Sequence, residues 1–249
     1  DRSKQSNFVI CYFNRNHSIS GLLMVALGQA NPNDEVDGNE QDVCEVISMA
    51  DSTSSCNNLP AYPLSLRSST GQLLNSVPII AGGYKSGFVS NIYNYDKQSD
   101  SWLSLGNLAK PRVDHSSSIL NGALWIIGGY SYGYLKSTEL VYPNGTISGP
   151  DLPTFRARHC SVQLEDGNII IIGGASTGKV TTIYDPETST YTDGPDMLFY
   201  HYNFACAHFY SQKHGERPVV LSAGAGYGGG SKAEVYDYTL ENGTWEESK

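Results

Sequence analysis

Charge is scarce in this sequence, and positive charge is scarcer still. Only 16% of the 249 residues are charged, and 16 Lys and Arg face 25 Asp and Glu, which leaves a formal net charge of −9. Nucleic acids and anionic membranes both attract proteins through clustered cationic side chains. The composition therefore argues against a nucleic-acid partner.

Long apolar runs are also missing. No stretch reaches the roughly 18 apolar residues that a membrane-spanning helix needs, so we expect no membrane insertion. The acidic segment 31–42 gathers carboxylates without a basic residue. Counted from Asp34, it lacks the glycine that an EF-hand needs at its sixth position, and we interpret it as a solvated loop.

Enzyme motifs fail where they are tested. GAGYGG at 224–229 fits a dinucleotide-binding pattern, but the following SKAEVYDY is typical of a strand and not of the helix that such a site requires. His201, Cys206 and His208 lie close in sequence, yet no paired Cys-x-x-Cys or His-x-x-x-His supports a metal site. We therefore expect no enzyme activity and no cofactor.

What the sequence does contain is glycine, with 26 residues, and a repeat built on it. Short apolar runs end at Gly82-Gly83, Gly128-Gly129 and Gly173-Gly174, spaced by 46 and 45 residues. Runs rich in β-branched and aromatic side chains and bounded by glycine are typical of buried strands. Weaker copies keep Gly28 and Gly224-Ala225.

Further markers keep the same period. The pairs Asn107-Leu108, Asp151-Leu152 and Asp196-Met197 close successive units. Five residues after the start of each pair come Arg112, Arg156 and His201, and three further on come His115, His159 and Phe204. A tyrosine leads by seven residues to a large aromatic in Tyr95–Trp102, Tyr184–Tyr191 and Tyr238–Trp245. Several markers in one register indicate a true structural repeat.

The apolar run that ends in Gly-Gly, the later tyrosine and the still later tryptophan together resemble the kelch repeat. The resemblance extends from about Leu74 to Trp245 and implies an all-β fold, a kelch-type β-propeller of four-stranded antiparallel blades. The third unit departs from the pattern, because no aromatic follows Tyr142, and Tyr191 stands where the repeat has Trp.

We expect a single propeller domain over 1–249. Its approximate blades are 7–60, 61–108, 109–152, 153–197 and 198–249, the last of them truncated. Kelch propellers have six or seven blades by this resemblance, so about five visible blades predict an incomplete propeller, a fragment of a longer one.

One face of such a propeller carries the candidate site. Strand alternation puts the loop between a blade's second and third strands on the same side as the segment that enters the next blade. That side gathers Tyr and Arg, which are enriched in binding hot spots. The resemblance implies that it takes partner peptides. The candidate partner-binding residues are Lys85, Phe88, Arg112, Tyr130, Tyr132, Tyr134, Arg156, Arg158, Tyr200 and Tyr227.

Two alternatives stay open at these positions. Arg112 and Arg156 can instead hydrogen-bond loop carbonyls between blades. His115 and His159 open inner strands at a repeated position, which favours a structural role.

Five cysteines leave at least one unpaired. Cys44 and Cys56 bracket an apparent strand–turn–strand, and a disulfide between them would indicate an oxidising compartment. Cys160 and Cys206 occupy inner-strand positions of adjacent blades, one residue apart in register, and we interpret them as free buried thiols. The compartment, cytoplasmic or secreted, therefore stays open.

The function that these observations favour is a non-catalytic protein–protein interaction module whose partner is a protein. The alternatives are an extracellular kelch-type propeller, glycan-binding or similar to the copper radical oxidases, and an actin-binding kelch protein. Glycosylation sequons at Asn16, Asn144 and Asn242 are no more frequent than chance predicts, so they do not separate these alternatives.

Overall fold

The computed structural model describes residues 56–248 except 61, 65, 216 and 227–230, and before them the strands at 9–10, 22–26 and 44–48. Tyr227, Asn16 and the acidic segment 31–42 lie outside the described residues. The described part consists of strands and one short 3-10 helix, η1 (Gln212–His214). The fold is therefore all-β, as the repeat predicts.

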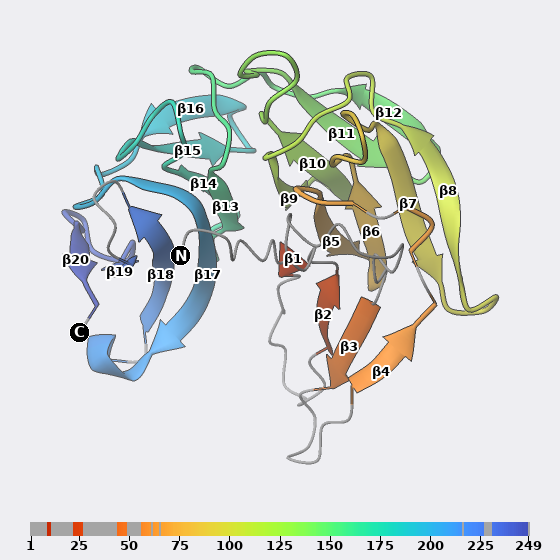
Figure 1. The fold of residues 1–249 in the computed structure, drawn as a ribbon. Coiled ribbons are helices and arrows are strands. Elements are labelled where there is room, and N and C mark those ends of the chain that lie inside the picture. Colours follow the sequence, from red (N-terminus) through yellow and green to blue (C-terminus); the bar gives the residue numbers. More distant parts are fainter. Residues whose placement is uncertain are drawn as a thin grey trace. The chain divides into compact units, whose positions relative to one another are not determined.

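Five four-stranded antiparallel sheets follow one another along the chain (Figure 1). The first holds β1 (Val9–Ile10), β2 (Leu22–Ala26), β3 (Cys44–Ser48) and β4 (Cys56–Leu59). The second holds β5 (Thr70–Leu74), β6 (Val77–Ala81), β7 (Asn91–Asp96) and β8 (Ser101–Asn107). In both, each strand pairs with the next along the chain.

The remaining three sheets keep this order. The third holds β9 (Ser116–Leu120), β10 (Ala123–Ile127), β11 (Thr138–Tyr142) and β12 (Gly145–Ser148). The fourth holds β13 (Cys160–Gln163), β14 (Ile169–Ile172), β15 (Thr181–Asp185) and β16 (Thr190–Asp193). The fifth holds β17 (His201–Ser211), β18 (Arg217–Gly226), β19 (Ser231–Tyr236) and β20 (Trp245–Glu247). Sequential four-stranded meanders are the blades of a propeller.

The chain divides into two compact units. Unit 1 comprises Asp1–Val113 with Pro143–Gly145, and unit 2 comprises Asp114–Tyr142 with Thr146–Lys249. In unit 1, Tyr62, Leu66, Ile80 and Trp102 form a buried cluster.

The isoleucines of β14 show how the sheets of unit 2 pack. Ile169 and Ile171 belong to a core cluster with Trp125 of β10, whereas Ile170 and Ile172 belong to a second cluster with Val220 of β18. Successive side chains of a strand point to opposite faces. The fourth sheet therefore buries both of its faces, one against the third sheet and one against the fifth.

Each glycine doublet ends its second strand in the same backbone conformation. The φ angles are 64° and 112° at Gly82-Gly83, 57° and 103° at Gly128-Gly129, and 57° and 114° at Gly173-Gly174. A Cβ on Gly128 would lie 2.6 Å from the Arg156 carbonyl oxygen. Both the left-handed φ and this close approach exclude a side chain.

The doublets also explain why the arginine positions keep phase with them. The second glycine of each doublet donates its N–H to the carbonyl of the repeated Arg or His, which lies in the segment that leads into the next sheet. These bonds join Gly83 to Arg112 at 2.8 Å, Gly129 to Arg156 at 2.7 Å and Gly174 to His201 at 3.0 Å. Two of the repeat markers are thus the two ends of one recurring hydrogen bond.

The fourth-strand aromatics make a second recurring bond. Trp102 donates to the Pro60 carbonyl at 3.0 Å, Tyr191 to Pro150 at 2.8 Å and Trp245 to Pro195 at 3.1 Å. The spacing of seven residues puts Tyr95 opposite Trp102 and Tyr184 opposite Tyr191. In the fifth sheet the residue opposite Trp245 is Tyr236 and not the marker residue Tyr238, because this hairpin is two residues longer.

Candidate protein-interaction face

The loop between β10 and β11 is a compact aromatic finger. Tyr130 and Tyr134 form an isolated bridge, and their rings meet edge to face with centroids 5.6 Å apart. Tyr132 stands at the tip with a φ of 55° and is 87% exposed. In unit 1, Tyr84 and Phe88 build the same bridge with an edge-to-face contact at 5.8 Å. The finger is therefore a repeated element.

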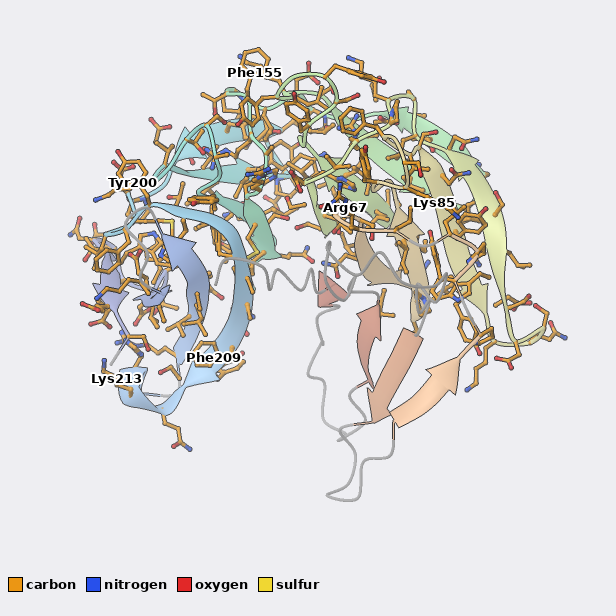
Figure 2. All side chains as sticks on the ribbon, in the orientation of Figure 1. Arg67, Lys85, Phe155, Tyr200, Phe209 and Lys213 are labelled. Carbon is orange, nitrogen blue, oxygen red and sulfur yellow. A yellow bond between two sulfur atoms is a disulfide. The ribbon has the colours of Figure 1, made fainter. Side chains whose placement is uncertain are left out.

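Two further aromatics stand on the links that enter the fourth and fifth sheets. Phe155 is 54% exposed and Tyr200 is 53% exposed, and each comes one residue before the marker position held by Arg156 or His201. Figure 2 shows both side chains projecting from their loops. Exposed aromatics that recur in register indicate a surface organised by the repeat.

A lysine from the preceding second-to-third-strand loop lies over each of these rings. The Lys136 ammonium is 5.1 Å from the centroid of Phe155, and the Lys179 ammonium is 5.5 Å from that of Tyr200. Lys136 also donates to the Pro153 carbonyl at 2.7 Å. Neither lysine forms an ion pair with a carboxylate of the described residues. We call Tyr132, Tyr134, Phe155, Tyr200, Lys136 and Lys179 the aromatic–lysine patch of unit 2.

Most of the predicted site residues lie at the surface, some of them in unit 1 and the others in unit 2. In unit 1, Lys85 is exposed and Phe88 is half-buried. In unit 2, Tyr132, Tyr134, Arg158 and Tyr200 are exposed and Tyr130 is half-buried. Arg158 pairs with Asp114 at 3.1 Å.

Arg112 and Arg156 are not surface residues. Their exposures are 0% and 1%. The Arg156 guanidinium donates to the carbonyls of Ile171, Gly173 and Val180 at 2.9–3.2 Å and to the Thr182 hydroxyl at 2.8 Å. Their placement on the binding surface is therefore corrected, and for Arg156 the geometry is that of the structural alternative.

His201, in the fifth sheet, occupies the position of Arg156 with different chemistry. Its Nε2 lies 2.9 Å from Glu234 on β19, and both side chains are fully buried. The same carboxylate accepts the backbone N–H groups of Leu198 and Phe199 at 2.6 and 2.9 Å. A buried carboxylate with several donors is well satisfied. This pair fixes the segment that presents Tyr200.

The histidines at the strand openings are buried as well. His115 and His159 are each 6% exposed, and His159 Nε2 lies 2.8 Å from the Ser116 hydroxyl. Burial, helped by the nearby charge of Arg156, holds the pKa of His159 well below its ordinary value. His159 is therefore a buried neutral residue, which fits the structural role that its repeated position favours.

The cysteines differ from the sequence-based interpretation. Cys160 on β13 and Cys206 on β17 form a disulfide, with Cα atoms 6.0 Å apart, so they are not free thiols. The apparent one-residue offset is absorbed in β17, whose register shifts between His201 and Phe204. An extra residue at such a bulge brings the two cysteines level.

A disulfide between Cys44 and Cys56, which the sequence left open, does not fit the backbone register. The register of β3 and β4 puts Cys44 opposite Leu59 and Cys56 opposite Ile47. An offset of three residues separates the two Cα atoms by roughly 10 Å along the strands. This exceeds the limit of about 7 Å for a disulfide.

The disulfide also bears on the metal alternative. Cys206 has no thiolate to offer, which leaves His201 and His208 without the third ligand that the sequence suggested. Within the described residues no group of three His, Cys, Asp or Glu is placed to hold a metal ion. In the same part of the chain, no helix is long and apolar enough to cross a membrane.

Sequence reasoning missed Phe155, Lys136 and Lys179. The sequence does contain a signal for Phe155, because Phe155 and Tyr200 each stand one residue before the repeated Arg or His position. The third unit has Pro111 at this place. The lysines could not be found this way, because their contact with the rings depends on how two loops fold toward each other.

Comparison with known proteins supports the repeat. No family model matches the chain. An F-box/kelch-repeat protein of Arabidopsis thaliana is 24% identical over 183 residues, covering 63% of this chain and 45% of that protein. A putative F-box/kelch-repeat protein of the same plant is 32% identical over 119 residues, covering 47% of this chain and 30% of that protein. A kelch domain-containing protein of Sulfurisphaera tokodaii is 25% identical over 139 residues, covering 53% and 20%.

The fold is shared with a solved structure. The structure of YjhT superposes with a TM-score of 0.65 at 11% identity, covering 98% of this chain and 97% of that one. At this identity the likeness concerns the fold alone. The chain spans less than half the length of the curated relatives it matches. The recurring glycine doublets, the four-stranded sheets and these relatives together identify this chain as a kelch-repeat β-propeller.

Proposed function

We propose that this chain is a non-catalytic protein-interaction module that binds a partner protein through its loop face. In unit 2 the contact is made by the aromatic–lysine patch together with Tyr130 and Arg158. In unit 1 the corresponding contributions come from Lys85 and Phe88. Tyr227 stays a prediction, and Arg112 and Arg156 support the loops from inside.

The observation that carries this proposal is a set of three exposed aromatic rings, two of which recur at one position of the repeat. Tyr132, Phe155 and Tyr200 expose more than half of their surface. Large aromatic side chains offer contact area with little loss of conformational entropy, which is why they concentrate in hot spots. The recurrence of Phe155 and Tyr200 on segments fixed by repeated hydrogen bonds supports a prepared binding surface.

The charge around the rings indicates the partner's chemistry. Lys136 and Lys179 place positive charge on a chain whose net charge is −9. Opposite charges across an interface raise the association rate and reject wrong partners. We infer a partner segment that presents carboxylates beside apolar or aromatic side chains.

The test is a peptide-display selection against the full chain, followed by affinity measurement. Selected peptides should be rich in acidic and aromatic residues, and Tyr132→Ala with Phe155→Ala and Tyr200→Ala should weaken them at least about tenfold. The matched control removes three other exposed side chains, by Ile147→Ala, Phe209→Ala and Leu240→Ala. Equal losses in both triple variants would refute the assignment of the site.

A second candidate is the extracellular kelch-type propeller, which the disulfide favours. Disulfides form and persist in oxidising compartments and are rare in the cytosol. Peptide mapping of the protein from its source would show Cys160 joined to Cys206 if this candidate holds, and free thiols at both positions if it does not. Actin binding stays a prediction, to be decided by co-sedimentation with filaments.

A further inference from the structure

Two Asn-Gly-Thr sequences occupy the same position in their blades. Asn144-Gly145-Thr146 lies at the turn between β11 and β12, and Asn242-Gly243-Thr244 lies at the turn between β19 and β20. Both turns join the third strand of a sheet to its fourth. Asparagine followed two residues later by threonine is the acceptor pattern for N-linked glycans.

Both asparagines are exposed, and neither side-chain amide is held by the described residues. Asn144 and Asn242 are among the exposed residues of their turns. At the second turn the backbone closes through a bond from the Gly243 N–H to the Leu240 carbonyl at 3.0 Å, which leaves the Asn242 side chain out of the turn's own hydrogen bonds. An acceptor amide has to reach a transferase, so this placement matters.

The position in the sheet leaves room for a bulky group. β12 and β20 are the outermost strands of their sheets. The core clusters of unit 2 take residues from several strands, Trp245 of β20 among them, but neither Asn144 nor Asn242 belongs to a cluster. A glycan on either asparagine is therefore attached to an exposed residue outside the core clusters.

The disulfide supplies an independent observation. Cys160 and Cys206 are joined within unit 2, and such bonds form where the chain passes through an oxidising lumen. In eukaryotic cells N-glycan transfer takes place in that same lumen. The sequons alone are no more frequent than chance predicts, whereas sequons in matched exposed turns of a disulfide-bonded chain are a specific combination.

We propose that Asn144 and Asn242 are acceptor sites for N-linked oligosaccharides. In the reaction the side-chain amide nitrogen forms a bond to the anomeric carbon of the sugar. The bond from that carbon to the diphosphate of a lipid-linked oligosaccharide donor breaks, the amide loses one proton, and the lipid diphosphate leaves. No oxidant or reductant is needed. The inference shares its oxidising compartment with the second candidate function and is independent of partner binding.

The experiment uses the full 249-residue chain secreted from eukaryotic cells behind an added signal sequence. Site-resolved mass spectrometry before and after peptide N-glycosidase should find glycans on Asn144 and Asn242. Asn144→Gln and Asn242→Gln should each remove one glycan. Thr146→Ala and Thr244→Ala should do the same while keeping the asparagine, and Thr146→Ser and Thr244→Ser should retain it. Asn121, exposed in the turn between β9 and β10 but followed by Gly122 and Ala123, is an internal control that should stay unmodified.

Non-reducing peptide mapping of the same sample separates the possible outcomes. A chain in which Cys160–Cys206 is formed and both asparagines are unmodified overturns the proposal. Glycans on both asparagines support it whether or not the selected peptides bind the loop face. Glycosylation of a chain whose cysteines stay reduced would support the acceptor sites and count against the disulfide as a marker of the same route.

Discussion

Arg156 was predicted to lie on the binding surface, and it is instead a buried residue that holds loops in place. Burial lowers its pKa from 12.5 to about 10, which still leaves it cationic at neutral pH. Its donors add a charge-assisted hydrogen bond to the carbonyls of Gly173 and Val180, which also accept from Thr177 and from the Gly173 N–H. The arginine thus stabilises the loops that carry the patch, and its contribution to binding is indirect.

Arg156→Met keeps much of the side-chain volume and removes every donor. We expect it to lower the free energy of unfolding by about 2–4 kcal/mol, measured by urea denaturation, because several buried hydrogen bonds from a charged donor are lost at once. The control is Arg158→Met, whose exposed pair with Asp114 should cost less than about 1 kcal/mol. Equal costs for the two variants would show that these buried hydrogen bonds carry no net stability.

His159 predicts the pH dependence of stability. Its pKa in the folded protein lies well below the ordinary value of 6.5, so below pH 6.5 the unfolded chain binds a proton that the folded chain does not. Stability should therefore fall as the pH drops below 6.5, by up to about 1.4 kcal/mol per pH unit from this histidine. His159→Asn should make the profile between about pH 7 and pH 5.5 flatter. An unchanged slope would assign the acid sensitivity to other groups.

At the scale of elements, the Cys160–Cys206 disulfide joins the innermost strands of two neighbouring sheets, β13 and β17. The cysteines are separated by 46 residues, one repeat. Closing a loop of this size stabilises a fold by roughly 2–4 kcal/mol, chiefly by restricting the unfolded chain.

A thiol reductant should lower the denaturation midpoint of the wild-type protein accordingly. The double variant Cys160→Ser with Cys206→Ser should start at the lower midpoint and show no response to the reductant. A reductant-sensitive double variant would locate the effect at the remaining cysteines.

The elements that could be predicted from sequence are those whose chemistry is local. Gly128-Gly129 marks a strand end because only glycine fits its φ angles and its close approach to the Arg156 carbonyl. A requirement for glycine can be recognised directly in the sequence. The spacing of Tyr95 and Trp102 marks a real unit of the repeat, because a hairpin of this length puts the two residues opposite each other.

The errors arose where an insertion changed the register. One extra residue in β17 hid the pairing of Cys160 with Cys206. In the last hairpin, two extra residues put Tyr236 opposite Trp245, which the seven-residue marker does not reveal. Burial of Arg156 was left open for a different reason. Whether a guanidinium turns inward depends on carbonyls that only the folded loops bring together.

At the scale of the whole molecule, stability is expected to concentrate in the second strands. Every residue of β10 and β14 is buried, whereas the fourth strands β12 and β16 are largely exposed. Each second strand is hydrogen-bonded on both sides, and in unit 2 the isoleucines of β14 contribute to two core clusters. An amide in such a strand exchanges only when its sheet opens.

Native-state hydrogen exchange should therefore rank the strands in a fixed order. We expect the slowest amides in β10 and β14, where opening requires the free energy of global unfolding, and exchange faster by orders of magnitude in β12 and β16. The comparison is internal, because each fast strand belongs to the same sheet as a slow one and the two share solvent and temperature. Equal protection across the four strands of a sheet would mean that each blade opens as a unit, and the core assigned to the β14 isoleucines would then not be what limits exchange.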